Sequence, residues 1–329
     1  MLDSIDREIR MACVGYHASH EQFAPSRLLA LVRQAETAGF DTAMCSDHFH
    51  PWSRAQGHSG YAWSWLGAAM AVTRLPFGVV TSPVGRYHPA VVAQKAATLA
   101  EMHRGRFWMA VGSGEALNEA ITGEPWPGKP QRNQRLLEAV EVMRALWAGE
   151  EVDHDGSFAV RNAKLYTRPS EPPRLLVAAL SEDTARWGAA WADGLITVNQ
   201  QPDRLRALVS AFREGGGDGK PMYLQVKLSY AADDAQALRG AYEQWRTNVL
   251  GAEASEELRT PQQFEAEALR VSAAQVADSV RVSCDPQRHV AWLQQDLALG
   301  FEQLYLHNVN QDQSRFIDVF GSAVLPALR

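Results

Sequence analysis

The sequence predicts an α/β protein, a (β/α)₈ TIM barrel with insertions. Apolar runs with strand character alternate with helical patterns along the whole chain. A length of 329 residues suits one such barrel, typically ~250 residues, plus insertions. Hydrophobic residues make up 46% of the chain, enough to fill one large core. We therefore predict a single domain over residues 1–329.

The predicted strands are short apolar runs bounded by polar or turn residues. They cover residues 11–16, 41–48, 77–82, 107–114, 174–180, 193–198, 222–230 and 303–309. The helices between them are predicted from apolar residues at i, i+3, i+4 and i+7, as at Leu28, Leu31, Val32 and Ala35. Alternating strands and helices predict a parallel barrel closed by its last strand.

Two segments are too long or too irregular to be simple connections. Residues 150–172 place turn residues between short apolar runs, which predicts an inserted β-hairpin. Residues 233–284 have a helical pattern throughout, which predicts a second, helical insertion. No linker divides the chain, so both insertions are assigned to the one domain.

Composition argues against several classes of function. The net charge is −6 and no basic block occurs, so nucleic acid is not the expected partner. No run of eighteen apolar residues occurs, so no membrane span is expected. The polar segment 1–10 lacks a secretory leader, which predicts a cytoplasmic location. The three cysteines are widely spaced and no metal-binding motif is present, so no metal site is predicted.

Polar residues follow most of the predicted strands. Barrel enzymes place the active site at the carboxyl ends of the strands, so these residues are expected to meet at one mouth. They include Tyr16, His17, Ser46, Asp47, His48, Ser82, Ser113, Glu115, Asn199, Lys227, His307 and Asn308.

Residues 46–52 read SDHFHPW and form the densest polar segment. A histidine at a strand end exchanges protons near neutral pH, and Asp47 would orient or charge His48. The alternative is a polar loop with a structural histidine.

Residues 112–115 read GSGE after the fourth strand. The glycines let a flat ligand approach the backbone, and Glu115 would face that ligand. The alternative is a tight turn, and the dinucleotide fingerprint fails at Leu117. Lys227, inside an apolar strand, either pairs with Glu115, touches a ligand or extends to the rim.

At these residues the sequence resembles the luciferase-like flavin and deazaflavin oxidoreductase superfamily. Within it, the chain is most similar to the coenzyme F420-dependent glucose-6-phosphate dehydrogenase group. The matching segments are VGYHASHEQFAP (14–25), SDHFHPW (46–52), RYHPAVVAQ (86–94), VGSGEALNE (111–119), ADGLIT (192–197) and DQSRF (312–316).

The resemblance implies site residues by position. His48, Glu115 and Trp52 match the catalytic residues, and Glu21 matches a carboxylate of the substrate pocket; we add His307 on the substrate side. The residues expected at the cofactor are Asp47, Val79, Val80, Ser82, Gly112, Ser113, Gly114 and Ser181. The family's non-proline cis peptide bond would fall at Val79–Val80.

Departures from the family pattern bear on substrate and cofactor. The three basic residues that hold the sugar phosphate correspond to Gln201, Ala266 and Ser279, so glucose 6-phosphate is not the expected substrate. A Gly-Gly pair near the cofactor phosphate is Leu180-Ser181 here, and Ser181 would open a helix that accepts a phosphate. This departure favours FMN, with coenzyme F420 as the other candidate.

The leading hypothesis is hydride transfer between a bound tricyclic ring and a small organic substrate. One alternative is an FMN-dependent two-component monooxygenase, with a flavin reductase as partner. Another is a non-catalytic flavin-binding protein. A homodimer is expected from the resemblance.

Overall fold

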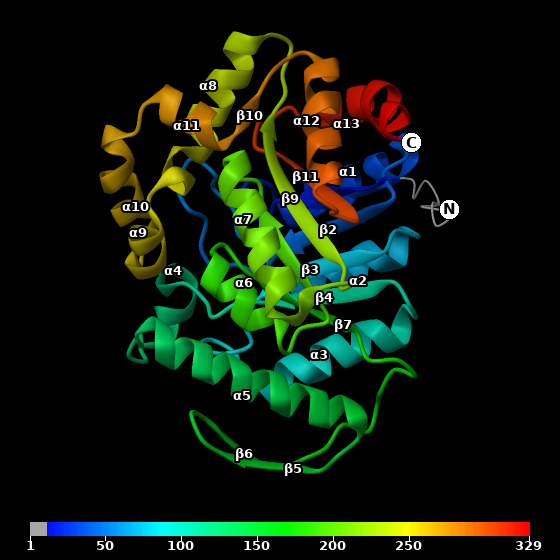
Figure 1. Ribbon diagram of the computed structural model, residues 1–329, viewed down its shortest axis with the longest axis vertical. Helices are drawn as coiled ribbons and strands as arrows, with labels where there is room; N and C mark the ends of the chain where they lie inside the picture. The colour runs from blue at the N-terminus through cyan, green and yellow to red at the C-terminus, as the bar shows by residue number, and fades with distance from the viewer. Residues whose placement is uncertain (1–11) are drawn as a thin grey trace, which may run out of the picture.

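A barrel of parallel strands forms the centre of the computed structural model, which describes residues 12–329 (Figure 1). Its strands are β1 (Cys13–Ala18), β2 (Thr42–Ser46), β3 (Phe77–Thr81), β4 (Phe107–Val111), β7 (Arg174–Ala178), β8 (Gly194–Val198), β9 (Met222–Ser229) and β11 (Gln303–Asn308). Neighbours pair in parallel, and β11 pairs with both β9 and β1, which closes the sheet. The predicted fold class is confirmed. Residues 1–10, and Met11 of the first predicted strand, lie outside the described residues.

Helices surround the barrel and cover its outer surface (Figure 1). They are α1 (Pro25–Ala38), α2 (Ala62–Val72), α3 (Pro89–Met102), α5 (Lys129–Ala148), α6 (Glu182–Ala189), α7 (Pro202–Phe212), α12 (Pro286–Ala298) and α13 (Gln313–Val319). The predicted apolar stripe of α1 is fully buried. Gly39 ends α1 with a φ of 94°, a left-handed conformation that glycine adopts without strain. None of the described helices is both long and apolar enough to cross a membrane.

Both irregular segments have structure of their own. Residues 150–172 contain the antiparallel strands β5 (Val152–Asp155) and β6 (Ala159–Ala163). The second segment holds α8 (Asp234–Trp245), α9 (Ala252–Glu257), α10 (Pro261–Glu267) and α11 (Ala273–Ser279). It ends with β10 (Arg281–Val282), a short strand beside β9 that the helical pattern did not predict. Figure 1 shows α9, α10 and α11 grouped on one side of the barrel.

Inward side chains fill the barrel below its carboxyl ends. Alternate residues of a strand point inward, and those of the lower layers are large. They form one buried cluster of Met44, Trp108, Ala110, Leu176, Ile196, Tyr223 and Tyr305. The indole of Trp108 donates a hydrogen bond to the Tyr305 hydroxyl at 3.0 Å. A ligand must therefore bind at the mouth, above this layer.

The prediction of a cis peptide bond at Val79–Val80 is wrong, because the described residues contain no cis peptide bond. Both valines pair in register with β2 on one side and β4 on the other. This continuous pairing holds the strand in its extended trans form, whereas a non-proline cis bond costs ~3–4 kcal/mol.

Gly78 supplies a prediction about the barrel core. A Cβ added at Gly78 would overlap the Trp108 indole, which is buried among other core side chains. Gly78→Ala should lower the free energy of unfolding by ~1–3 kcal/mol, as overpacking does. Urea unfolding followed by tryptophan fluorescence measures this.

Gly67→Ala is the matched control. Gly67 lies in α2, and nothing stands within 4 Å of its added Cβ. Alanine is the better helix former, so this variant should be neutral or gain up to ~1 kcal/mol. Equal stability of both variants would contradict the packing described for Gly78.

Candidate active site

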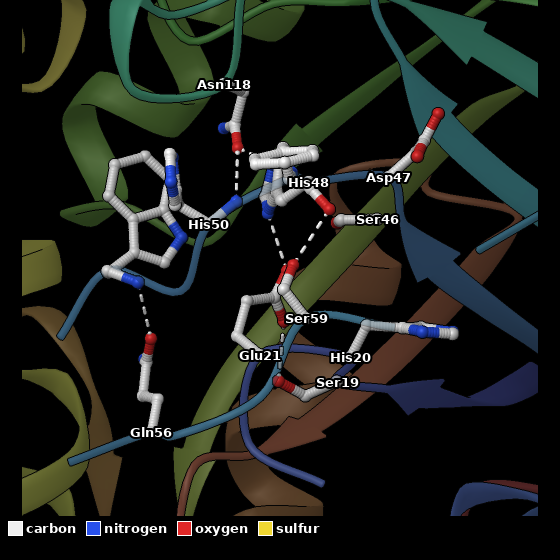
Figure 2. A network of polar contacts seen from close by, with 12 residues as sticks. Ser19, His20, Glu21, Ser46, Asp47, His48, His50, Gln56, Ser59 and Asn118 are labelled. Carbon is white, nitrogen blue, oxygen red and sulfur yellow. Dashed lines mark hydrogen bonds and ion pairs between the residues drawn. The ribbon is translucent and has the colours of Figure 1, made fainter. Parts of the chain in front are cut away.

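The buried Glu21 and the partly buried His48 form an ion pair at the mouth. Glu21 follows β1 and His48 follows β2, and these two strands pair in parallel, so their loops lie side by side. Nδ1 of His48 lies 2.5 Å from Oε1 of Glu21, and the Ser19 hydroxyl donates to Oε2 at 2.8 Å (Figure 2). Because Nδ1 is committed to Glu21, Nε2 is the nitrogen that His48 presents to a ligand.

Each member of this pair changes the pKa of the other. Burial disfavours the charged imidazole, but the hydrogen bond and the negative charge of Glu21 outweigh it and raise the pKa of His48. Burial also disfavours the carboxylate, yet the contact with His48 outweighs it and holds the pKa of Glu21 well below its usual range. The pair therefore favours the protonated form of His48 and the ionised form of Glu21.

Glu115 is the second carboxyl of the mouth and has the opposite tendency. It follows β4 and immediately precedes the short helix α4 (Ala116–Glu119). Burial raises the pKa of Glu115, partly offset by His48, Lys227 and Asn118. Asn118 donates to Glu115 at 3.4 Å and accepts from the backbone N–H of Phe49 at 2.8 Å. Asn118 thus links the Glu115 segment to the loop that carries His48 (Figure 2).

Trp52 forms an aromatic wall beside His48. The two rings meet edge to face, with centroids 5.6 Å apart. Trp52 also packs edge to face on Phe264 of α10, at 5.1 Å, and shares a buried cluster with Phe264 and Leu117. The helical insertion therefore covers this side of the mouth. The structure brings the predicted catalytic residues His48, Glu115 and Trp52 to the same end of the barrel.

The glycine-rich loop after β4 offers an open backbone surface. Gly112, Ser113 and Gly114 are partly exposed, as are the inward side chains Val80 and Ala178. A Cβ at Gly112 would meet only Ala178, at 3.8 Å. Gly114 has a φ of 81°, and its Cβ would stand 2.7 Å from the Glu119 side chain, so only glycine fits. This surface of small groups fits a flat ring such as a flavin or deazaflavin.

Asp47 does not orient His48, which corrects that expectation. Its carboxylate points away from the imidazole (Figure 2). Oδ2 accepts from the indole N–H of Trp63 at 2.8 Å and from the Thr81 hydroxyl at 2.9 Å, and Oδ1 lies 3.0 Å from the Arg86 guanidinium. Glu21 takes the orienting role instead, because the loop after β1 is closer to the imidazole.

The other predicted cofactor residues lie in different surroundings. The Val79 side chain is in the core between sheet and helices, so only its backbone faces the mouth. Ser82 is buried and donates to the Val84 carbonyl at 3.0 Å. Ser181 is exposed and caps α6 by accepting from the Thr184 N–H at 3.4 Å. Their contacts with a cofactor remain predictions.

His307 is buried and fully hydrogen-bonded. Its Nε2 lies 3.0 Å from the Gln22 side-chain oxygen, and its Nδ1 lies 3.1 Å from the Gln225 side-chain nitrogen. Its ring stacks on His17 at 4.2 Å, and burial lowers its pKa well below the usual value. Both nitrogens are occupied, so contact between His307 and a substrate stays a prediction.

Lys227 is a cation of the mouth without a close carboxylate. Its Nζ lies 5.6 Å from the centre of the Trp245 ring, and no carboxylate of the described residues is within 4.0 Å of it. Burial lowers its pKa to about 8, and the charge of Glu115 opposes that shift. A direct Lys227–Glu115 ion pair is therefore absent from the described structure. Within the same part of the chain, no cluster of three or more His, Cys, Asp or Glu side chains is arranged to hold a metal ion.

Several contacts of the site had no separate signal in the sequence. Ser19, Asn118, Arg86 and Glu119 all hold loops of the mouth in place. Three of them lie inside the segments VGYHASHEQFAP and VGSGEALNE, and Arg86 opens RYHPAVVAQ. Their position in these motifs was the available clue, but the motifs alone do not specify partners.

Comparison with known proteins identifies related sequences along the whole chain. A family model described as luciferase-like monooxygenase matches residues 10–303. An F420-dependent glucose-6-phosphate dehydrogenase of Beutenbergia cavernae is 38% identical over 330 residues, covering 97% of this chain and 98% of that protein. One of Mycobacterium tuberculosis (strain H37Rv) is 36% identical over 329 residues, covering 96% and 98%.

Solved structures share the fold. An F420-dependent secondary alcohol dehydrogenase, in complex with an F420-acetone adduct, superposes with a TM-score of 0.89 at 30% identity and covers 97% of this chain and 99% of its own. A riboflavin lyase with modified FMN superposes with a TM-score of 0.76 at 16% identity, covering 97% and 92%. The second likeness concerns the fold alone.

The Glu21–His48 pair supplies a prediction about proton affinity. Glu21→Gln removes the negative charge but leaves His48 buried, so the pKa of His48 should fall to its ordinary value of about 6.5 or below. NMR titration of the His48 ring protons measures this. Ser59→Ala is the control, because Ser59 contacts only the His48 backbone carbonyl, at 2.8 Å.

The same variant should show a defined pH window in stability. The raised pKa of His48 stabilises the fold at low pH, and this contribution is lost as pH rises through the folded value. The lowered pKa of Glu21 contributes above about 4.5 and is lost as pH falls. The stability difference between wild type and Glu21→Gln should therefore peak between about pH 4.5 and 6.5. If the pKa of His48 is the same in Glu21→Gln as in wild type, Glu21 does not determine the pKa of His48.

Proposed function

The chain belongs to the luciferase-like monooxygenase family, and from this premise we propose that it is an F420-dependent oxidoreductase that interconverts a small uncharged alcohol and its carbonyl compound. The relatives of this family make the chain an enzyme rather than a storage protein. The observation that carries the proposal is the His48–Glu21 pair beside Glu115 at the open glycine surface.

The side chains of the mouth divide the proton transfers between them. The open backbone surface of Gly112, Ser113 and Gly114 would hold a flavin or deazaflavin ring, and that ring would supply the hydride-transfer chemistry. In its neutral form His48, whose Nδ1 faces Glu21, accepts the hydroxyl proton of the alcohol at Nε2, and the protonated form returns that proton in the reverse direction. Glu21 stabilises the imidazolium that results. Glu115, whose pKa is raised by burial, holds a proton on the ring side, and Trp52 keeps water from the reacting carbon.

Coenzyme F420 is proposed ahead of FMN. Relatives that match nearly the whole chain at 36–39% identity are F420-dependent enzymes. The preference for FMN predicted from Leu180-Ser181 rests on a single loop. The other support for FMN is the riboflavin lyase structure, which is only 16% identical and shares the fold alone. FMN remains the second candidate through Ser181, which opens α6 at an exposed helix start, but Glu182 and Asp183 in the first turn of α6 oppose the binding of a phosphate there.

The substrate is proposed to be uncharged. Gln201, Ala266 and Ser279 lie exposed at the start of α7, on α10 and at the end of α11. Gln201 donates to the Asp278 carbonyl at 3.0 Å, which places two of these positions together. None carries a cation for a phosphate dianion. The wall of Trp52 and Phe264 suits an apolar carbon skeleton.

Experiments on the purified wild-type protein test both the proposed cofactor and the proposed substrate class. F420 should bind, shown by quenching of its fluorescence, and propan-2-ol should then bleach its visible band. Glucose 6-phosphate should do so at least ~100-fold less efficiently, because an unpaired dianion is poorly held. Faster turnover of glucose 6-phosphate would contradict the proposed substrate. Binding of FMN alone, with oxygen consumption when a flavin reductase is added, would support the monooxygenase alternative.

His48→Ala tests the proton-transfer role. Loss of a general acid–base typically costs 10²–10⁴-fold in turnover, whereas the ring contacts the glycine surface and should bind almost as before. The measurements are kcat and the dissociation constant for F420. His103→Ala, at the end of α3 on the far side of the barrel, is the control. Full activity of His48→Ala would remove His48 from the mechanism. The expected homodimer is a separate prediction, which sedimentation measures.

A further inference from the structure

Arg86 lies between the loops that carry His48 and Glu115 and contacts both. We propose that Arg86 is a positioning residue that sets the spacing of these two proton-transfer groups by tying Asp47 to Glu119. This inference rests on the proposed function, since it concerns how the loops of the same site are held at a fixed spacing.

The first set of contacts joins Arg86 to the His48 loop. Its guanidinium lies 3.0 Å from Oδ1 of Asp47 and also donates to the Asp47 backbone carbonyl. Asp47 directly precedes His48, and its other oxygen is held by Trp63 and Thr81 at 2.8 and 2.9 Å. The backbone that leads into His48 is therefore fixed by Arg86 at two points.

The second set joins Arg86 to the Glu115 segment. The backbone N–H of Arg86 donates to Glu119 Oε2 at 2.9 Å, and its guanidinium donates to Oε1 at 3.1 Å. Glu119 ends α4, the short helix that Glu115 precedes. Gly85 and Gly114 both have positive φ, and a Cβ at either would press on the Glu119 side chain, at 2.7 Å. The fold thus keeps space for this one carboxylate.

Burial makes these contacts strong and their loss costly. The side chains of Arg86, Asp47 and Glu119 are 6%, 1% and 3% exposed. Burial raises the pKa of Glu119 to about 7 even beside Arg86, so without the guanidinium Glu119 would take up a proton and its link to Asp47 would be lost. The hydrogen bonds of Arg86 that hold the loops after β2 and β4 at their spacing would be lost with it. Lysine keeps the charge but lacks the planar fork that reaches both carboxylates at once.

Arg86 does not itself reach the reacting groups through any contact of the described structure. Its effect on turnover comes through the positions of His48 and Glu115. Since a displacement of ~1 Å at a catalytic group can cost ~10²-fold in rate, even a small widening is measurable.

The test compares Arg86→Lys and Arg86→Gln with Arg106→Lys. Arg106 is a matched control, because its partly buried guanidinium holds the backbone carbonyls of Met70, Thr73 and Leu75 at the other end of the barrel. We expect Arg86→Lys to bind F420 within about threefold of wild type, to keep KM for propan-2-ol within a similar range, and to lose ~10–100-fold in kcat. Arg106→Lys should keep its kcat.

Two further measurements separate positioning from general loss of structure. Added guanidinium ion should restore part of the activity of Arg86→Ala, whereas ammonium should not, because only the planar fork bridges both carboxylates. Hydrogen–deuterium exchange should rise in residues 46–50 and 115–119 together in Arg86→Lys, and in neither segment in Arg106→Lys.

The outcomes distinguish this inference from the proposed function. If wild type does not use F420, the proposed function fails, and the exchange experiment still decides the role of Arg86 without substrate. If wild type is active and Arg86→Lys matches Arg106→Lys in kcat and in exchange, Arg86 is not a positioning residue. Loosening of only one of the two segments would equally overturn the inference.

Discussion

Most of the charged groups between β1 and β4 at the barrel mouth are buried, and burying a charge is costly unless a partner offsets it. Here the partners come from the loops of neighbouring strands. Glu21 after β1 holds His48 after β2, while Asp47 after β2 is held by Arg86 after β3, which also holds Glu119 after β4. The ion pairs therefore follow the order of the strands around the rim. A requirement of electrostatics links four consecutive loops into one rigid edge.

This arrangement gives the two carboxyls of the mouth opposite properties. Glu21 is close to His48, and its pKa is lowered despite burial, so it stays ionised and favours the protonated imidazole. Glu115 has no ion pair within 4.0 Å among the described residues, and burial raises its pKa. Two groups of the same chemistry thereby acquire opposite protonation tendencies, a pattern common where an active site needs both an acid and a fixed charge. The distinction arises from the surroundings of each carboxyl and not from its residue type.

The sequence predicted the strands and helices well, because their apolar residues recur at a regular spacing. It predicted individual side-chain contacts less well. Apolar periodicity located all the barrel strands, and the rule that parallel strands end at one mouth then brought His48, Trp52 and Glu115 together. It did not reveal that Glu21, distant in sequence, and not the adjacent Asp47 meets the imidazole, because that depends on side-chain direction at the strand ends. The trans peptide bond at Val79–Val80 follows from strand pairing, and the hydrogen bonding of both His307 nitrogens follows from neighbouring side chains. Residue types alone specify neither.

The groups proposed for proton transfer and those proposed for substrate selection lie in different parts of this fold. His48 and Glu115 stand on barrel loops, whereas Phe264 of the aromatic wall and the neutral positions Ala266 and Ser279 belong to the helical insertion. Ala266 and Ser279 are exposed, and neither takes part in the ion pairs that hold His48 and the loops after β2 and β4. Under the proposed function, these neutral positions and not a different set of proton-transfer groups would separate this chain from enzymes that bind a phosphorylated substrate.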